Sequence, residues 1–143
     1  MSTIIIYISK SGATKRCAEI LAKNISGSVL CDIQKHIPLI DDFDTIIIGS
    51  GIRMGKIYKP MNKFIKKNLS LLMSKSTAIF LCNYYSETFL KAIENNIPKE
   101  LSESVICIES LGGKKPFASN LDENTWIKQE NMITFVHALE QYI

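Results

Sequence analysis

The sequence has few of the features that mark a membrane or secreted protein. Its longest apolar run surrounds residues 45–48, far short of the about 20 residues that a membrane-spanning helix needs. At the N-terminus, no basic segment precedes an apolar stretch and a cleavage site, so we expect no signal peptide. These absences predict a cytoplasmic protein without integral membrane association.

Cysteine and histidine are also sparse. The chain has four cysteines and two histidines, with no Cys-x-x-Cys pair and no histidine at zinc-ligand spacing from a cysteine. We therefore expect no metal site. Free cysteines are among the most frequently buried residues, so the four thiols are predicted to be reduced core residues.

Strong charge of either sign is missing as well. The 143 residues include 17 Lys+Arg and 14 Asp+Glu, which gives a net charge of +3. This weak balance, without a recognition motif or a basic strand with interleaved aromatics, argues against nucleic-acid binding. The length and the 46% apolar content favour one domain over residues 1–143 with a substantial core.

Short apolar runs rich in β-branched residues alternate with helical periods along the chain. The runs predict five strands, at residues 3–8, 29–33, 45–48, 78–82 and 105–108. Apolar stripes predict helices over residues 17–25, 60–72, 89–97 and from about 124 or 125 to 143. Residues 34–44 are too few for a full crossover helix, so a turn or a stub of helix is expected there. The alternation predicts an α/β protein with a doubly wound parallel sheet.

The first strand leads into a short polar loop before the first helix. Its sequence is Ser9-Lys10-Ser11-Gly12-Ala13-Thr14. Glycine lets the backbone approach an anion, and the free N–H groups at a helix start attract phosphate. The alternative is an ordinary helix N-cap, for which serine and threonine are common choices. The spacing matches neither a Walker A loop nor a dinucleotide fingerprint.

Two segments resemble the flavodoxin-like family of FMN-binding proteins. The first loop resembles the family's phosphate loop. Residues 48–55, followed by Phe64-Ile65-Lys66-Lys67, are similar to the branch that contains the quinone-dependent protoporphyrinogen dehydrogenases. The resemblance implies a five-stranded parallel sheet ordered 2-1-3-4-5, with helices on both faces and ligand at the carboxyl ends of the strands.

The resemblance also implies which residues hold FMN. The phosphate would be held by residues of the first loop: Ser9, Lys10, Ser11, Gly12, Ala13 and Thr14. The isoalloxazine would be flanked by the loops after the third and fourth strands: Ser50, Gly51, Ile52, Arg53, Met54 and Gly55, and Asn83, Tyr84, Tyr85 and Ser86. Gly112 and Gly113, in the turn after the fifth strand, would be close enough in such a sheet to contribute to the FMN site.

Several of these residues have a second interpretation. Gly51 or Gly55 would offer a carbonyl to the flavin N5–H by resemblance, but either would also suit an ordinary turn. Tyr84 and Tyr85 would stack on the ring, or lie half-buried with their hydroxyls in water. Arg53 would meet an anionic substrate or the flavin, or would pair with a nearby acidic residue: Asp41, Asp42 or Asp44.

The resemblance implies an FMN-binding redox protein that carries electrons or acts as a small flavin oxidoreductase, with no catalytic residue assigned. One alternative is a protoporphyrinogen dehydrogenase-like enzyme, although residues 111–124 are short and polar where that branch has a longer aromatic and basic segment. A second alternative is a flavin-free interaction domain. A receiver domain is excluded because Ser9-Lys10 and Gly49-Ser50 stand where it requires acidic residues.

Positive charge is concentrated in the middle of the chain. Residues 45–86 have seven basic residues and no acidic one. Four of them have spacings that place them together on a helix: Lys59, Lys63, Lys66 and Lys67. Such a run is either a solvated helix face or a docking surface for an acidic redox partner protein or an anionic small-molecule substrate.

Overall fold

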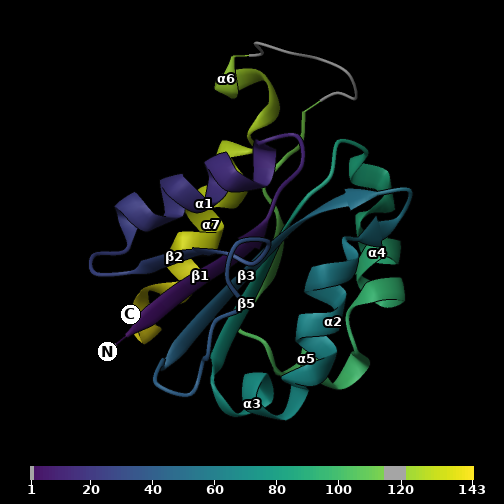
Figure 1. Cartoon of the computed structure of the whole chain (residues 1–143). Coiled ribbons are helices and arrows are strands. Elements are labelled where there is room, and N and C mark those ends of the chain that lie inside the picture. Colours follow the sequence, from purple (N-terminus) through teal and green to yellow (C-terminus); the bar gives the residue numbers. More distant parts are fainter. Residues whose placement is uncertain (1, 115–121) are drawn as a thin grey trace.

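The computed structural model describes residues 2–114 and 122–143 and has a parallel sheet between two helical layers (Figure 1). Neighbouring strands in the sheet follow the order β2-β1-β3-β5-β6. Their bounds are Thr3–Ile8 for β1, Val29–Asp32 for β2, Thr45–Arg53 for β3, Ser76–Cys82 for β5 and Ile108–Ser110 for β6. Counted along the chain, these five parallel strands have the predicted order 2-1-3-4-5, which is confirmed.

A sixth strand, β4 (Lys56–Ile57), lies outside the parallel order. It pairs antiparallel with the end of β3, with Ile52 opposite Ile57 and Arg53 opposite Lys56. The sequence did not predict this hairpin, because a strand of two residues is too short to show periodicity.

Helices cover both faces of the sheet, as predicted. On one face lie α1 (Ala13–Asn24) and α7 (Gln129–Leu139), preceded by α6 (Glu123–Trp126). On the other lie α2 (Lys59–Lys67), α3 (Leu69–Ser74), α4 (Phe89–Asn96) and α5 (Lys99–Ser104). Two 3-10 helices, η1 (Ser86–Thr88) and η2 (Glu140–Tyr142), complete the elements. Within the described ranges, no helix is long and apolar enough to cross a membrane.

Alternation along the central strands divides the core into two halves. In β1, Ile4 and Ile6 pack with the α2–α5 layer, whereas Ile5 packs with α1 and α7. In β3, Ile48 packs with the α2–α5 layer, whereas Ile47 packs with α1 and α7. Successive side chains of a strand point to opposite faces, so the near-continuous apolar runs reflect burial on both sides.

Several predicted boundaries differ from the structure. The first helix, α1, begins at Ala13 rather than at residue 17, and β3 ends at Arg53 rather than at residue 48.

The helix expected over 60–72 is two helices, α2 and α3, separated at Asn68, whose backbone departs from helical geometry with φ of −109° and ψ of 19°. The Phe64 carbonyl accepts both the backbone N–H and the side-chain amide of Asn68, at 3.0 and 2.9 Å. The closing helix expected from about 124 or 125 does start there, as α6, but it is interrupted at Ile127, which forms a bridge with Gly112, and resumes as α7 at Gln129.

The last strand was also predicted too early. β6 begins at Ile108, not at residue 105, because the unpredicted helix α5 continues to Ser104 and Val105 is its C-cap. Pro98 ends α4 as expected, but it is also the N-cap of α5. Proline is well tolerated at the start of a helix, so one residue ends one helix and begins another.

The connection between β2 and β3 contains turns and no helix, within the expectation of a turn or a stub. As a result, no crossover helix covers the sheet at this point. The connection leaves two large apolar side chains in solvent, since Ile37 is 69% exposed and Leu39 is 84% exposed.

The two ends of the chain meet at the amino edge of the sheet (Figure 1). The Ser2 carbonyl accepts the Thr45 N–H at 3.0 Å, and the Thr45 hydroxyl donates to the Tyr142 carbonyl at 3.0 Å. The first residue of β3 therefore ties both ends of the chain together.

Gly49 is predicted to be intolerant of any side chain. A Cβ atom at this position would lie 2.0 Å from Cζ of the buried Phe80 ring. Gly49→Ala should lower the free energy of unfolding by about 2–3 kcal/mol, because the core must shift to relieve the overlap. Urea denaturation measures the change.

The matched test adds Phe80→Leu, which removes the ring edge that the new Cβ meets. The double variant should lose less stability than the sum of the two single variants, by about 1 kcal/mol or more. Additive losses would show that Gly49 and Phe80 do not interact in this way.

Candidate functional site

Four loops that carry the predicted site residues meet at the carboxyl edge of the sheet. They follow β1, β3, β5 and β6, which are parallel. Contacts also join the loops directly, since a Cβ atom at Gly113 would lie 2.6 Å from the Tyr84 backbone nitrogen. The structure thus brings together segments that are about a hundred residues apart in the sequence.

The loop after β1 ends in an open helix N-terminus. Gly12 is the N-cap of α1 with φ of 92°, a conformation that glycine adopts without strain. The Ser9 hydroxyl accepts the Gly12 N–H at 3.1 Å, and the Ser11 hydroxyl accepts the Ala13 N–H at 3.4 Å. Among the described residues, no side chain caps the following N–H groups. The first turn of α1 also has no acidic residue, so the helix start can accept an anion.

The remaining residues of this loop differ in exposure. Thr14 and Ala13 are buried beneath the loop, whereas Lys10 and Ser11 are exposed. The Lys10 ammonium lies 4.8 Å from the ring centroid of Tyr58, a cation–π contact between the first loop and the segment after the hairpin.

The loop after β3 is the tip of the β3–β4 hairpin. Met54 and Gly55 have φ of 54° and 78°, so both central residues have the positive φ that a two-residue type I′ turn requires. Met54 is 93% exposed. The Gly55 carbonyl accepts a hydrogen bond from the Asn96 side chain at 2.8 Å, which ties the turn to α4.

Ser50, Gly51 and Ile52 form the base of the hairpin. The buried Ser50 hydroxyl donates to the Gly51 carbonyl at 2.9 Å and accepts the Tyr58 N–H at 3.5 Å. Ile52 is partly buried and packs against the core. A Cβ atom at Gly51 would lie 3.0 Å from the Tyr58 hydroxyl, so Gly51 allows the tyrosine to approach the strand.

Arg53 is exposed at the end of β3. It forms no ion pair with any carboxylate in residues 2–114 and 122–143, so the pairing with the three nearby aspartates is not observed. Burial raises the pKa of the Tyr58 hydroxyl, and the nearby positive charge of Arg53 partly offsets this effect. Arg53 is therefore available to an anion at the site.

The loop after β5 is shaped by Asn83. Its buried side-chain amide donates to the Tyr85 carbonyl and to the Thr88 hydroxyl, both at 2.8 Å, and its oxygen accepts the Tyr85 N–H at 3.3 Å. The Asn83 side chain thus acts as a positioning residue for the loop. Ser86 begins η1, and its side chain lies outside what the structure describes.

Tyr84 and Tyr85 are about half exposed and pack edge to face, with ring centroids 4.9 Å apart. Their aromatic faces are therefore partly open to a planar ligand.

Gly112 has φ of 99°, and a Cβ atom there would lie 1.9 Å from the Trp126 carbonyl oxygen. Gly112 and Gly113 thus let the loop after β6 pack against its neighbours.

Sequence reasoning missed Lys114 as a site residue. Its ammonium lies 3.6 Å from the position that a Cβ at Gly12 would occupy, 3.5 Å from the Ser11 carbonyl oxygen and 5.4 Å from the Trp126 ring centroid. It therefore adds a positive charge above the start of α1. The signal available was its position directly after Gly112-Gly113, which the sequence had placed near the site.

Below these loops lies a pair of buried free thiols. The Cys17 and Cys82 sulfur atoms are 3.8 Å apart. The hydrogen bond with Cys82, together with burial, raises the pKa of the Cys17 thiol strongly. Both residues are buried in the core, as predicted for Cys82.

Comparisons with known proteins agree with this architecture. A family model described as a flavodoxin domain matches residues 4–123. Protoporphyrinogen IX dehydrogenase (quinone) of Escherichia coli strain K12 is 26% identical over 88 residues, which cover 58% of this chain and 49% of the relative. The chain thus spans about half the length of the curated relatives it matches.

Two solved structures illustrate the shared fold. A flavoprotein of Lactobacillus acidophilus, in complex with FMN, has 22% identity and a TM-score of 0.57, covering 76% of this chain and 92% of that one. Oxidised flavodoxin 1 of Bacillus cereus has 16% identity and a TM-score of 0.66, covering 100% and 99%.

The hairpin tip provides a test of the site geometry. Met54→Asn places Asn-Gly in the type I′ turn and should raise the free energy of unfolding by about 0.5–1 kcal/mol, because asparagine tolerates positive φ better than methionine. Met54→Val, which is β-branched, should lower it. Thermal or urea unfolding distinguishes the two, and equal effects would contradict the turn geometry.

Proposed function

Because the chain belongs to the flavodoxin domain family, we propose that it is an FMN-binding redox protein that carries electrons or acts as a small flavin oxidoreductase. The observation that carries this proposal is the open start of α1. There a left-handed Gly12, free backbone N–H groups and the Lys114 ammonium converge on one point.

The chemistry of this point fits the FMN phosphate. A phosphate dianion is stabilised by backbone N–H groups, hydroxyl donors and the positive end of a helix dipole. Ser9, Ser11 and Thr14 supply the hydroxyls, and the Lys10 and Lys114 ammonium groups lie on either side of the loop. These side chains would hold the phosphate end of the cofactor.

When bound, FMN supplies the one- and two-electron chemistry, and the protein binds and orients it. The hairpin tip and the pair Tyr84 and Tyr85 would flank the ring. Either Gly51 or Gly55 would offer a carbonyl at the ring edge. The Gly55 carbonyl accepts the Asn96 amide, which fixes its direction, and Arg53 would provide positive charge for a substrate or for the flavin.

Members of this family transfer electrons to redox partners, and the partner proposed for this chain is acidic. Residues 45–86 have seven basic and no acidic residues. A cytoplasmic location is part of the proposal, because the four cysteines are free thiols, which reducing compartments maintain.

Oxidation of a porphyrinogen is the second candidate function. It is favoured by the match to protoporphyrinogen IX dehydrogenase (quinone) over 88 residues. A quinone-dependent protoporphyrinogen oxidation assay, run beside electron exchange with a flavodoxin reductase, separates the two candidates. Turnover of protoporphyrinogen would favour the second, and electron exchange without such turnover would favour the first.

The phosphate site is tested by adding negative charge to the first loop. Ser11→Asp keeps an acceptor for the Ala13 N–H but places a carboxylate where the phosphate binds, so FMN affinity should fall by about tenfold or more. Thr14→Asp should act in the same direction from below the loop. Quenching of FMN fluorescence on titration with protein measures both.

Ser70→Asp is the matched control, because it adds the same charge on α3 at the opposite edge of the sheet. Its FMN affinity should equal that of the unmodified protein. Absence of FMN binding by the unmodified protein at micromolar concentrations would refute the proposed function. Unchanged affinity in both loop variants would place the phosphate elsewhere.

A further inference from the structure

A groove of about 520 Å³ runs between α2 and the connection from β2 to β3. Its apolar lining includes Ile33, Ile37, Leu39 and Phe64. The groove exists because this connection contains no crossover helix, so the face of α2 turned toward β2 has no helical neighbour. Ile37 and Leu39 consequently present large apolar side chains to solvent.

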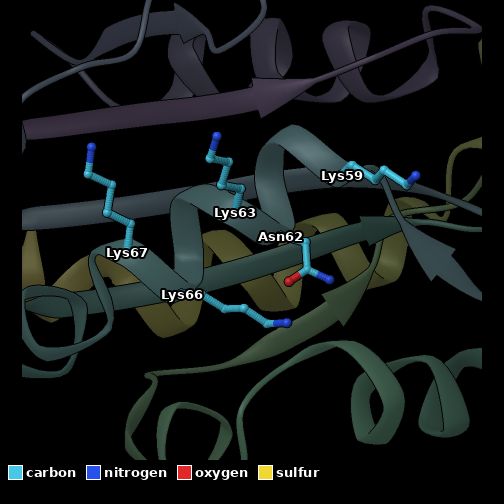
Figure 2. Close-up of a pocket in the computed structure, with 5 residues that line it drawn as sticks. All are labelled: Lys59, Asn62, Lys63, Lys66 and Lys67. Atoms are coloured by element: carbon cyan, nitrogen blue, oxygen red, sulfur yellow. The ribbon is translucent and has the colours of Figure 1, made fainter.

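The helical wall of the groove is basic. Lys59, Lys63 and Lys67 all line it, at i, i+4 and i+8 along α2. Figure 2 draws a second hollow over α2, distinct from the groove, and shows Lys63 and Lys67 extending from one side of the helix and Lys66 from the other. No aspartate or glutamate lines the groove, and none of the three lysines has an ion pair among the described residues.

An apolar floor with a row of free ammonium groups selects for one kind of ligand. Apolar side chains in the floor would gain by leaving water, and carboxylates would compensate the lysines. An amphipathic helix with an acidic polar face satisfies both demands at once. A purely acidic or a purely apolar surface satisfies only one of them.

The groove also opens near the proposed cofactor site. Lys59 follows Tyr58, whose ring contacts Lys10 of the first loop. The groove therefore begins beside the segment that joins the hairpin to the phosphate loop. A protein docked there would lie next to the edge at which electrons would leave or enter.

We infer that this groove is the docking site for an acidic amphipathic helix of the protein that exchanges electrons with this one. The inference rests on the proposed redox function and specifies its partner: leucine-like side chains fill the floor between Ile37, Leu39 and Phe64, and carboxylates face Lys63 and Lys67. The electrostatic part of this recognition is weakened by salt.

A synthetic helical peptide with leucines on one face and glutamates on the other provides the probe, with a counterpart in which lysines replace the glutamates. Fluorescence anisotropy should show at least about tenfold tighter binding of the acidic peptide to the unmodified protein. Lys63→Glu should remove this preference. Leu39→Ser should weaken the acidic peptide by about fivefold or more, since the floor loses its exposed apolar anchor.

Lys66→Glu is the matched control, because it makes the same charge change on the other side of α2. It should change the affinity by less than about threefold. Equal losses in the Lys63 and Lys66 variants, or unchanged binding by Leu39→Ser, would overturn the groove as the docking site. Equal affinity for both peptides would overturn the acidic partner.

Two further measurements separate the remaining explanations. Sedimentation velocity of the unmodified protein should show a monomer, and a dimer that Leu39→Ser dissociates would show that a second copy of this chain fills the groove instead. FMN titration of the unmodified protein separates the two proposals. FMN binding without peptide binding refutes the docking site alone, whereas absence of FMN binding refutes the redox function.

Discussion

The arrangement of the whole chain depends on parallel pairing along both sides of β3. β3 pairs with β1 on one side and β5 on the other, and Ile46, Ile47 and Ile48 are fully buried between two helical layers. A parallel sheet is stable when both of its faces are covered, so the chain must return across a face after each strand. This constraint also collects the loops after β1, β3 and β5 at one edge, which is where the Gly12 loop, the β3–β4 hairpin and the tyrosine pair meet.

One connection between strands differs from the others, and this difference creates the apolar groove beside α2. Between β2 and β3 the chain forms turns instead of a helix, so α2 has no helical neighbour on the side toward β2. A row of three lysines along α2 lines the resulting apolar groove, and charged groups beside an apolar surface oppose unspecific association. The candidate site and the groove are connected by the short segment around Tyr58, whose ring contacts Lys10 of the first loop and which leads directly into α2.

Most of the strands and loops could be predicted from the sequence, because they depend on the local pattern of apolar and polar residues. Apolar runs located β1 and β5 closely, whereas β3 continues to Arg53, beyond its predicted end at residue 48. The polar loop was placed at the start of α1, which begins inside it at Ala13. The β3–β4 hairpin was missed because it consists of two pairs of residues around a methionine that has an unusual positive φ. Asn68 divides a continuous apolar stripe through a local change of backbone dihedrals that periodicity cannot reveal. Lys114 reaches Gly12 across about a hundred residues, a proximity set by the fold alone.

The meeting of both chain ends at the start of β3 has a topological consequence. Thr45 joins the backbone near residue 2 to the backbone at Tyr142, at the edge of the sheet opposite the loops. A polypeptide joined to either end would extend away from the loops of the candidate site. A short linker between the two ends would close the chain into a ring, and the backbone could then be reopened at an exposed turn such as Gly27 without disturbing the opposite edge of the sheet.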